Sequence, residues 1–165
     1  MKYTIFPLGN PGSEYEYTRH NAARIAFRNA NLEDTGAELV TPDCYMNESG
    51  RFVKSYLKYR NNCIPVIVYD DIDLPLAKIK ISFGRSAGGH NGVQNVIDEL
   101  GTEDFVRIRI GIGGKPHKEM LLQDYVISKL SKEEVEILKA LGKSLSDIVA
   151  TIEKSGVDKA MEKYN

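Results

Sequence analysis

Residues 8–21 read LGNPGSEYEYTRHN, a stretch that turns the chain from a strand into a helix and brings a histidine to the junction. The β-branched and aromatic residues at 3–8 predict the strand. The Gly-Asn-Pro-Gly sequence then forces a turn, because proline fixes φ and glycine allows positive φ. Thr18 is a suitable N-cap for a helix that we expect to run to about Asn31, with His20 in its first turn.

The predicted position of His20 indicates a chemical role. The positive end of a helix dipole disfavours the charged imidazolium, so we expect a neutral base near pH 7. Asn10 lies in the preceding turn, and we expect its backbone and side chain to face outward at the end of the strand. A single histidine at such a junction is more often an ordinary surface residue, and only the further motifs favour catalysis.

A continuous apolar run at 64–69 predicts a central strand that is covered on both faces. Asp70 follows at its carboxyl end, where the sites of open α/β sheets collect. Asp71 and Asp73 complete a group of three carboxylates that a divalent metal could use. No calcium-binding loop or phosphate-binding P-loop accompanies them, so we predict no metal and interpret the latter two as turn formers.

The remaining apolar patterns alternate between strand and helix periods, as an α/β fold requires. A glycine-rich loop at 84–92 can approach a ligand closely, but it lacks the register of a dinucleotide-binding GxGxxG. We expect a loop that starts at 116–118 and leads through Leu121, Leu122 and Tyr125 towards a lid, and a capping box at Ser131. The further predicted elements are strands at 37–40, 78–83 and 105–112, and helices at 47–61, 93–100, 132–154 and after Gly156.

Length and composition favour one domain, 1–165. With 165 residues and 42% hydrophobic content, the chain can build one sizeable core. We therefore expect a single α/β domain with a mixed, mostly parallel sheet and helices on both faces. The formal net charge of −1 gives no global basic field, so any contact with RNA has to come from a local patch.

The cysteines and the lack of long apolar runs indicate the compartment. Cys44 and Cys63 have no CxxC partner and no histidine at a metal-ligand spacing, which is typical of a reducing environment without structural zinc. No apolar run reaches transmembrane length, and the N-terminus lacks a signal-peptide core. We expect a cytoplasmic protein that does not contact a membrane.

Five motifs, taken together, resemble those of the bacterial-type peptidyl-tRNA hydrolase family. Each motif alone is weak, but all five occur in the order that the family has, within residues 8–113. They are NPGSEYEYTRHN at 10–21, YMNESG at 45–50, DDIDLP at 70–75, GGHNG at 88–92 and FVRIRIGIG at 105–113.

The resemblance implies a monomeric esterase without metal or cofactor, which acts in translation and ribosome rescue. Its substrate is peptidyl-tRNA, cleaved between the peptide and the 3′ ribose. It implies that His20 is the catalytic base and that Asp70 orients it. The absence of a Gly-x-Ser-x-Gly elbow agrees with water as the nucleophile. The residues that the resemblance implies in substrate binding are Asn10, Tyr15, Asn47 and Asn91.

Two positions in these motifs also have an ordinary structural interpretation. Asn47 is an adequate N-cap for the helix that follows it, and His90 could be only a turn residue. The resemblance favours substrate binding by Asn47 and by Asn91, whose amide would lie over the scissile bond.

Basic residues on two predicted strands and the loop after one of them form a candidate patch for tRNA phosphates. The contacts that we predict in this patch are Lys80, Arg85 and Arg109. A solvated sheet face explains the alternating pattern equally well. Ser82 stands where the family has a phosphate-binding lysine, so we expect a weaker grip on the acceptor stem unless Lys80 or Arg85 substitutes.

The chain departs from the family before residue 41, where relatives carry a longer segment with an extra antiparallel strand pair. Two alternatives to the family activity therefore stay open. One is a non-catalytic RNA-binding module, like the plant organelle splicing factors of this fold, and the other is an esterase with an altered substrate. The presence of Asn10, His20, Asp70 and Asn91 argues against the module.

Overall fold

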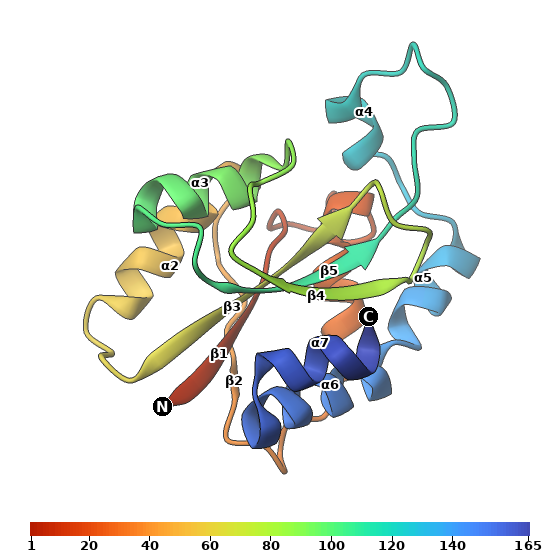
Figure 1. Cartoon of the computed structure of the whole chain (residues 1–165). Helices are drawn as coiled ribbons and strands as arrows, with labels where there is room; N and C mark the ends of the chain where they lie inside the picture. The colour runs from red at the N-terminus through yellow and green to blue at the C-terminus, as the bar shows by residue number, and fades with distance from the viewer.

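Five strands form one sheet in the order β2-β1-β3-β5-β4, with helices on both faces (Figure 1). The computed structural model describes all residues, 1–165. Strands β2, β1, β3 and β5 run parallel, and β4 pairs antiparallel with β5 at the edge. This confirms the predicted α/β domain with its mixed, mostly parallel sheet. The strands are β1 (Lys2–Pro7), β2 (Glu38–Leu39), β3 (Cys63–Asp71), β4 (Ile79–Phe83) and β5 (Val106–Gly111).

Two groups of helices lie on opposite faces of the sheet, as Figure 1 shows. Helices α2 and α3 pack over one core, and α1, α5, α6 and α7 pack over a larger core on the other face. No helix is long and apolar enough to cross a membrane. The helices and 3-10 turns are η1 (Arg19–Asn21), α1 (Ala22–Phe27), η2 (Met46–Glu48), α2 (Ser49–Leu57), α3 (Asn91–Leu100), α4 (Leu122–Val126), α5 (Lys132–Lys139), α6 (Gly142–Ser155) and α7 (Val157–Tyr164).

Alternation along β3 divides its side chains between the two cores. Val68 belongs to the core beneath α1, whereas Tyr69 belongs to the core beneath α2 and α3. Because successive side chains of a strand point to opposite faces, the next two residues separate in the same way. Asp70 therefore extends from the face that carries α1 and His20, and Asp71 extends from the face that carries α2 and α3.

Helix α1 is shorter than the sequence predicted. It ends at Phe27 instead of Asn31, because the N–H groups that follow bond carbonyls three residues back and tighten the chain. A separate 3-10 turn, η1, carries His20 immediately before it. Thr18 stands at the N-cap of η1, but its hydroxyl donates to the carbonyl of Tyr15, so the predicted side-chain cap is absent.

Helix α2 also departs from the prediction of 47–61. It comprises nine residues, 49–57, and the 3-10 turn η2 precedes it. Glu48 occupies its N-cap, so the interpretation of Asn47 as the N-cap is wrong. Asn47 lies in the middle of η2 and is exposed.

The helix predicted at 132–154 is two helices, α5 and α6. The capping box at Ser131 is present, with reciprocal hydrogen bonds between the side chains and backbone N–H groups of Ser131 and Glu134. The break lies before Gly142, which packs against the backbone beyond α1: a Cβ here would lie 2.6 Å from the carbonyl carbon and oxygen of Asn29. Apolar periodicity carries no information about such a backbone contact.

We expect Gly142→Ala to destabilise the protein, although alanine is the better helix former by about 1 kcal/mol. The added methyl group would meet the backbone of Asn29, and overpacking of this kind typically costs about 1–3 kcal/mol. Urea unfolding followed by circular dichroism measures the change. Ser144→Ala, at an exposed position of the same helix, is the control and should leave stability unchanged or slightly raised. A higher free energy of unfolding for Gly142→Ala would contradict the close contact.

Candidate functional site

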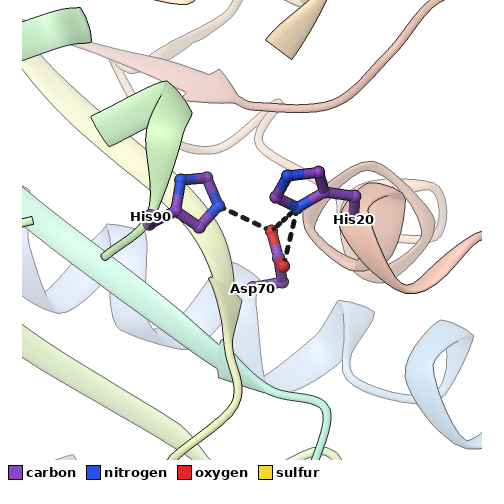
Figure 2. Close-up of side chains that lie close together, drawn as sticks. All are labelled: His20, Asp70 and His90. Carbon is purple, nitrogen blue, oxygen red and sulfur yellow. Dashed lines mark hydrogen bonds and ion pairs between the residues drawn. The ribbon is translucent and has the colours of Figure 1, made fainter. Parts of the chain in front are cut away.

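Asp70 accepts hydrogen bonds from two imidazole rings at the carboxyl end of β3 (Figure 2). His20 Nδ1 lies 3.0 Å from Oδ1 and 2.8 Å from Oδ2 of Asp70, and His90 Nε2 lies 2.8 Å from Oδ1. His20 comes from η1, and His90 is the N-cap of α3. The carboxylate is only 3% exposed, so the two rings supply the polar contacts that it needs.

A backbone N–H fixes the direction of the hydrogen bonds in this cluster. The N–H of Val93 can only donate, and it lies 3.2 Å from His90 Nδ1. His90 therefore carries its proton on Nε2 and donates it to Asp70. The ionised carboxylate accepts a second hydrogen bond from Nδ1 of His20, which therefore carries a proton. In neutral His20 the other nitrogen, Nε2, is then unprotonated, and it is directed away from Asp70 in Figure 2.

Burial and ion pairing act in opposite directions on the pKa values of His20 and Asp70. Burial by itself would lower the pKa of His20, but the charge and hydrogen bond of Asp70 raise it above the ordinary value of 6.5. Burial by itself would raise the pKa of Asp70, but the two histidines hold it well below its usual range. The expectation that a helix dipole keeps His20 neutral is therefore wrong in direction, because the adjacent carboxylate outweighs a three-residue 3-10 turn.

The same three side chains bring potential metal-ligand atoms within 4.8 Å of one another. The nitrogen–oxygen separations in the cluster are 2.8–3.0 Å. Two ligands of one tetrahedral zinc ion, at bond lengths of about 2.0–2.1 Å, would stand roughly 3.3 Å apart. The spacing therefore matches direct hydrogen bonds, and each ring already has a partner for the nitrogen that faces the carboxylate.

The cluster borders a pocket of about 260 Å³ at the carboxyl edge of the sheet. His20, Asp70 and His90 line it together with Asn91 and the glycine loop that precedes α3. Helix α4, which projects beyond the sheet in Figure 1, contributes Leu122, Gln123 and Val126 to the lining. The segment predicted to lead towards a lid therefore lies beside the pocket, and the lid itself stays a prediction.

Met46 brings the three predicted amide residues together. The N–H of Met46 donates to Asn10 Oδ1 at 2.7 Å. Asn47 follows Met46 in η2, and Gly92, next to Asn91, packs so closely that a Cβ on it would lie 2.5 Å from Met46 Sδ. Asn10 is buried, so the prediction that its backbone and side chain face outward is wrong. Because its Oδ1 is held by an N–H, Nδ2 is the group that is left to donate to a ligand.

The other predicted binding residues lie around this point with more exposure. Asn47 and Asn91 are exposed, and Asn91 lines the pocket. Tyr15 is half-buried and packs edge-on against Tyr45, with 6.3 Å between the ring centroids. Substrate contacts by these side chains stay predictions.

The predicted phosphate contacts differ in accessibility. Arg109 is only 9% exposed, and its Nη1 donates to Asp71 at 2.9 Å. Lys80 lies opposite Arg109 across the β4–β5 pair, and Arg85 is exposed. Arg85 and Arg109 both line the pocket, which gives a phosphate one route to the buried guanidinium. Phosphate binding by these three residues stays a prediction.

Arg107, by contrast, does not belong to a solvated sheet face, and that interpretation of the strand is wrong. Arg107 has no exposed surface and donates to the carbonyls of Arg85 and Ser86. Ser82 lies opposite it, with a buried hydroxyl that has no hydrogen-bond partner. Arg107 therefore supports the loop that leads to His90, and it offers no charge to a phosphate.

His90 is the member of the cluster that the sequence did not identify. The pattern Gly-Gly-His before a helix is adequate for an N-cap, and the His90 side chain does accept from the N–H of Val93. Its second contact, with Asp70, spans 20 residues and exists only because β3 and α3 meet at one edge of the sheet. The position in the GGHNG motif was the one available signal.

Comparisons with known proteins give the same family at the level of sequence and structure. A family model described as peptidyl-tRNA hydrolase matches residues 24–165. The peptidyl-tRNA hydrolases of Fervidobacterium nodosum and Thermodesulfovibrio yellowstonii are each 39% identical to this chain, over 98% of it and 94% and 97% of their own lengths. Two solved structures, a peptidyl-tRNA hydrolase in complex with N-propanol and the enzyme of Acinetobacter baumannii, match with TM-scores of 0.83 and 0.82. Their identities are 29% and 28%, and each match covers 99% of this chain and 94% of the other.

The aligned lengths also bear on the predicted shortening. The alignment with the Fervidobacterium protein spans 176 positions, more than the 165 residues of this chain, so this chain lacks residues that the relative has. The shortening leaves the sheet, both cores and the His20–Asp70–His90 cluster in place. With sequence matches over nearly its full length and a shared fold, the chain belongs to the peptidyl-tRNA hydrolase family.

Proposed function

We propose that this protein hydrolyses the ester bond between the peptide and the 3′ ribose of peptidyl-tRNA, with a water molecule that His20 activates. One observation carries the proposal. A series of hydrogen bonds runs from the N–H of Val93 through His90 and Asp70 to Nδ1 of His20, and it leaves Nε2 of His20 free beside the pocket. A family relationship over nearly the whole chain supports the same substrate.

In the proposed reaction, Nε2 of His20 takes a proton from water as the water oxygen bonds to the ester carbonyl carbon. The bond from that carbon to the ribose oxygen then breaks, and His20 returns the proton to the ribose oxygen. The products are the free peptide carboxylic acid, which ionises, and intact tRNA. Asp70 stays ionised throughout and stabilises the transient imidazolium.

Asn10 is suited to the carbonyl oxygen of the ester. Its Oδ1 is engaged by Met46, so Nδ2 can donate to the oxygen as negative charge develops on it. Asn47, Asn91 and Tyr15 would then contact the peptide and ribose. These neutral side chains orient the substrate and carry no charge that would alter the pH dependence.

The proposed partner is tRNA, bound by a monomer in the cytoplasm. Arg85 and Arg109 border the pocket, and Lys80 lies next to Arg109 on the adjacent strand. These three residues are the proposed contacts to tRNA phosphates.

The test is release of the acyl group from N-acetyl-aminoacyl-tRNA compared with unblocked aminoacyl-tRNA. We expect the wild type to hydrolyse only the blocked form. His20→Ala should lower kcat by about 10²–10⁴-fold, the usual contribution of a general base, while tRNA affinity is retained. His117→Ala removes an exposed histidine outside the pocket and should leave kcat unchanged.

Other outcomes distinguish the alternatives. Release from neither substrate would support a non-catalytic RNA-binding module, and equal release from both would support an esterase with altered specificity. Near-normal turnover by His20→Ala would remove His20 from the mechanism.

The pH dependence should report the Asp70–His20 pair. A general base has to be neutral, so kcat/KM should rise with pH through the raised pKa of His20, above 6.5. Asp70→Asn removes the charge that raises this pKa, so the rising part of the pH–rate profile, its acid limb, should move to lower pH. The maximal rate should also fall, but by less than in His20→Ala. Asp73→Asn, which removes an exposed carboxylate from the same pocket, should leave the limb in place. An unchanged limb in Asp70→Asn would contradict the assignment.

Salt dependence should report the phosphate contacts. Arg85→Ala should weaken tRNA binding and reduce the slope of log affinity against log salt by about one contact, roughly 0.7–0.9. Ser82→Lys, which the resemblance predicts to steepen the slope, should leave it at the wild-type value, because the Ser82 hydroxyl is buried opposite the enclosed Arg107. Arg60→Ala, in an exposed residue after α2, is the control with no expected change. Identical slopes for all four proteins would place the tRNA elsewhere.

A further inference from the structure

We propose that Asn21 is a positioning residue that holds Asn10 in register with the catalytic histidine, an inference that rests on the proposed function. The Asn10 N–H donates to Asn21 Oδ1, and Asn21 Nδ2 donates to the Asn10 carbonyl, both at 2.9 Å. Asn21 is only 3% exposed. The side-chain amide of Asn21 therefore pairs both the N–H and the carbonyl of Asn10, and both hydrogen bonds are shielded from water.

The segment that carries Asn10 needs such an anchor because no strand holds it. β1 ends at Pro7, and no backbone–backbone hydrogen bond involves the N–H or carbonyl of Asn10. The two groups that a strand would pair are instead paired by the Asn21 side chain. Without Asn21 these buried groups would lack partners, and the segment would move to reach water.

Close packing of the preceding residue shows that the segment is pressed against the helix. A Cβ on Gly9 would lie 2.6 Å from Arg24 Nε and 2.9 Å from Asn21 Oδ1. Arg24, one turn further along, donates to the carbonyls of Pro7, Gly9 and Pro42. Asn21 and Arg24 thus fix the loop from one side of α1, and Asn21 acts directly on Asn10.

The register between the two functional groups follows from sequence adjacency. His20 and Asn21 are neighbours in η1. The same short turn therefore places both the catalytic base and the side chain that holds the backbone of Asn10. The remaining contact of Asn10, from Met46 to Oδ1, then orients Nδ2. The donor for the ester oxygen and the base for the water are thereby held by one rigid element, as effective catalysis requires.

We expect Asn21→Ala to lower kcat for N-acetyl-aminoacyl-tRNA by about 10- to 100-fold, because misplacement of a catalytic group by about 1 Å has effects of this size. KM should change little, since Asn21 makes no contact with the proposed phosphate-binding residues Lys80, Arg85 and Arg109. The midpoint pH of the acid limb reports the pKa of His20, so it should be the same as in the wild type. Rates are normalised to folded protein measured by circular dichroism.

A control with the same pattern of hydrogen bonds exists at the β4 edge of the sheet. Asn165 brackets the backbone of Ile81 with the same pair of hydrogen bonds, both 2.8 Å, outside the pocket. Asn165→Ala removes the same pair of hydrogen bonds at an exposed residue, so kcat per folded molecule should stay at the wild-type value. A fall in kcat that is equal in the two variants would assign Asn21 a merely structural role and overturn the proposal.

A double-mutant cycle with Asn10→Ala separates action through Asn10 from action on other groups. If Asn21 works through Asn10, adding Asn21→Ala to Asn10→Ala should leave kcat unchanged. A further fall by the single-mutant factor would overturn the proposal. If Asn21→Ala does not fold, Asn21→Asp takes its place: it keeps the acceptor for the Asn10 N–H and loses the donor, and at high pH its kcat should be reduced at least several-fold.

Hydrogen exchange of the Asn10 N–H gives a readout that does not depend on activity. Exchange should accelerate in Asn21→Ala and stay unchanged in Asn165→Ala. If the wild type shows no ester hydrolysis, the proposed function fails, and the exchange rate still decides whether Asn21 holds Asn10. Unchanged exchange in Asn21→Ala would overturn the positioning role in either case.

Discussion

The buried carboxylate of Asp70 is the interaction on which the site depends. A charge with 3% exposure is tolerable only with hydrogen-bond donors on its oxygens, and His20 from η1 and His90 from the N-cap of α3 provide them. The same bonds hold both rings and select the nitrogen of His20 that stays free. The hydrogen bonds that stabilise the buried Asp70 carboxylate are therefore the same ones that orient His20 as a base.

Strand geometry gives the two adjacent aspartates different partners. Asp70 and Asp71 are neighbours, but the pleat of β3 turns them to opposite faces. Asp70 meets the imidazoles, whereas Asp71 accepts from Arg109 on the neighbouring strand and from the N–H of Asp73 in the following turn. The interpretation of Asp71 as a turn former is confirmed, and the structure adds its ion pair. Residue type alone does not separate these two roles, because the carboxylates are chemically identical.

Burial likewise separates arginines that look equivalent in the sequence. Arg107 and Arg109 have the same spacing on β5, yet Arg107 is enclosed beneath loop carbonyls and Arg109 borders the pocket. A two-residue period shows that both lie on one face. It does not show what covers that face, since the covering loop comes from a different part of the chain. The alternating pattern alone therefore does not separate the two arginines, and the difference in their burial appears only in the folded protein.

The sequence by itself determined the α/β class, the central strand before Asp70, the capping box at Ser131 and the candidate residues His20 and Asp70, because periodicity, turn residues and ordered motifs are local signals. Helix ends, the break at Gly142 and the contact of His90 with Asp70 were decided by the tertiary structure. So were the raised pKa of His20 and the bracket of Asn21 around Asn10. Each of these depends on groups distant in the chain, whose burial and mutual distance arise only when β1, β3 and α3 meet at one edge of the sheet.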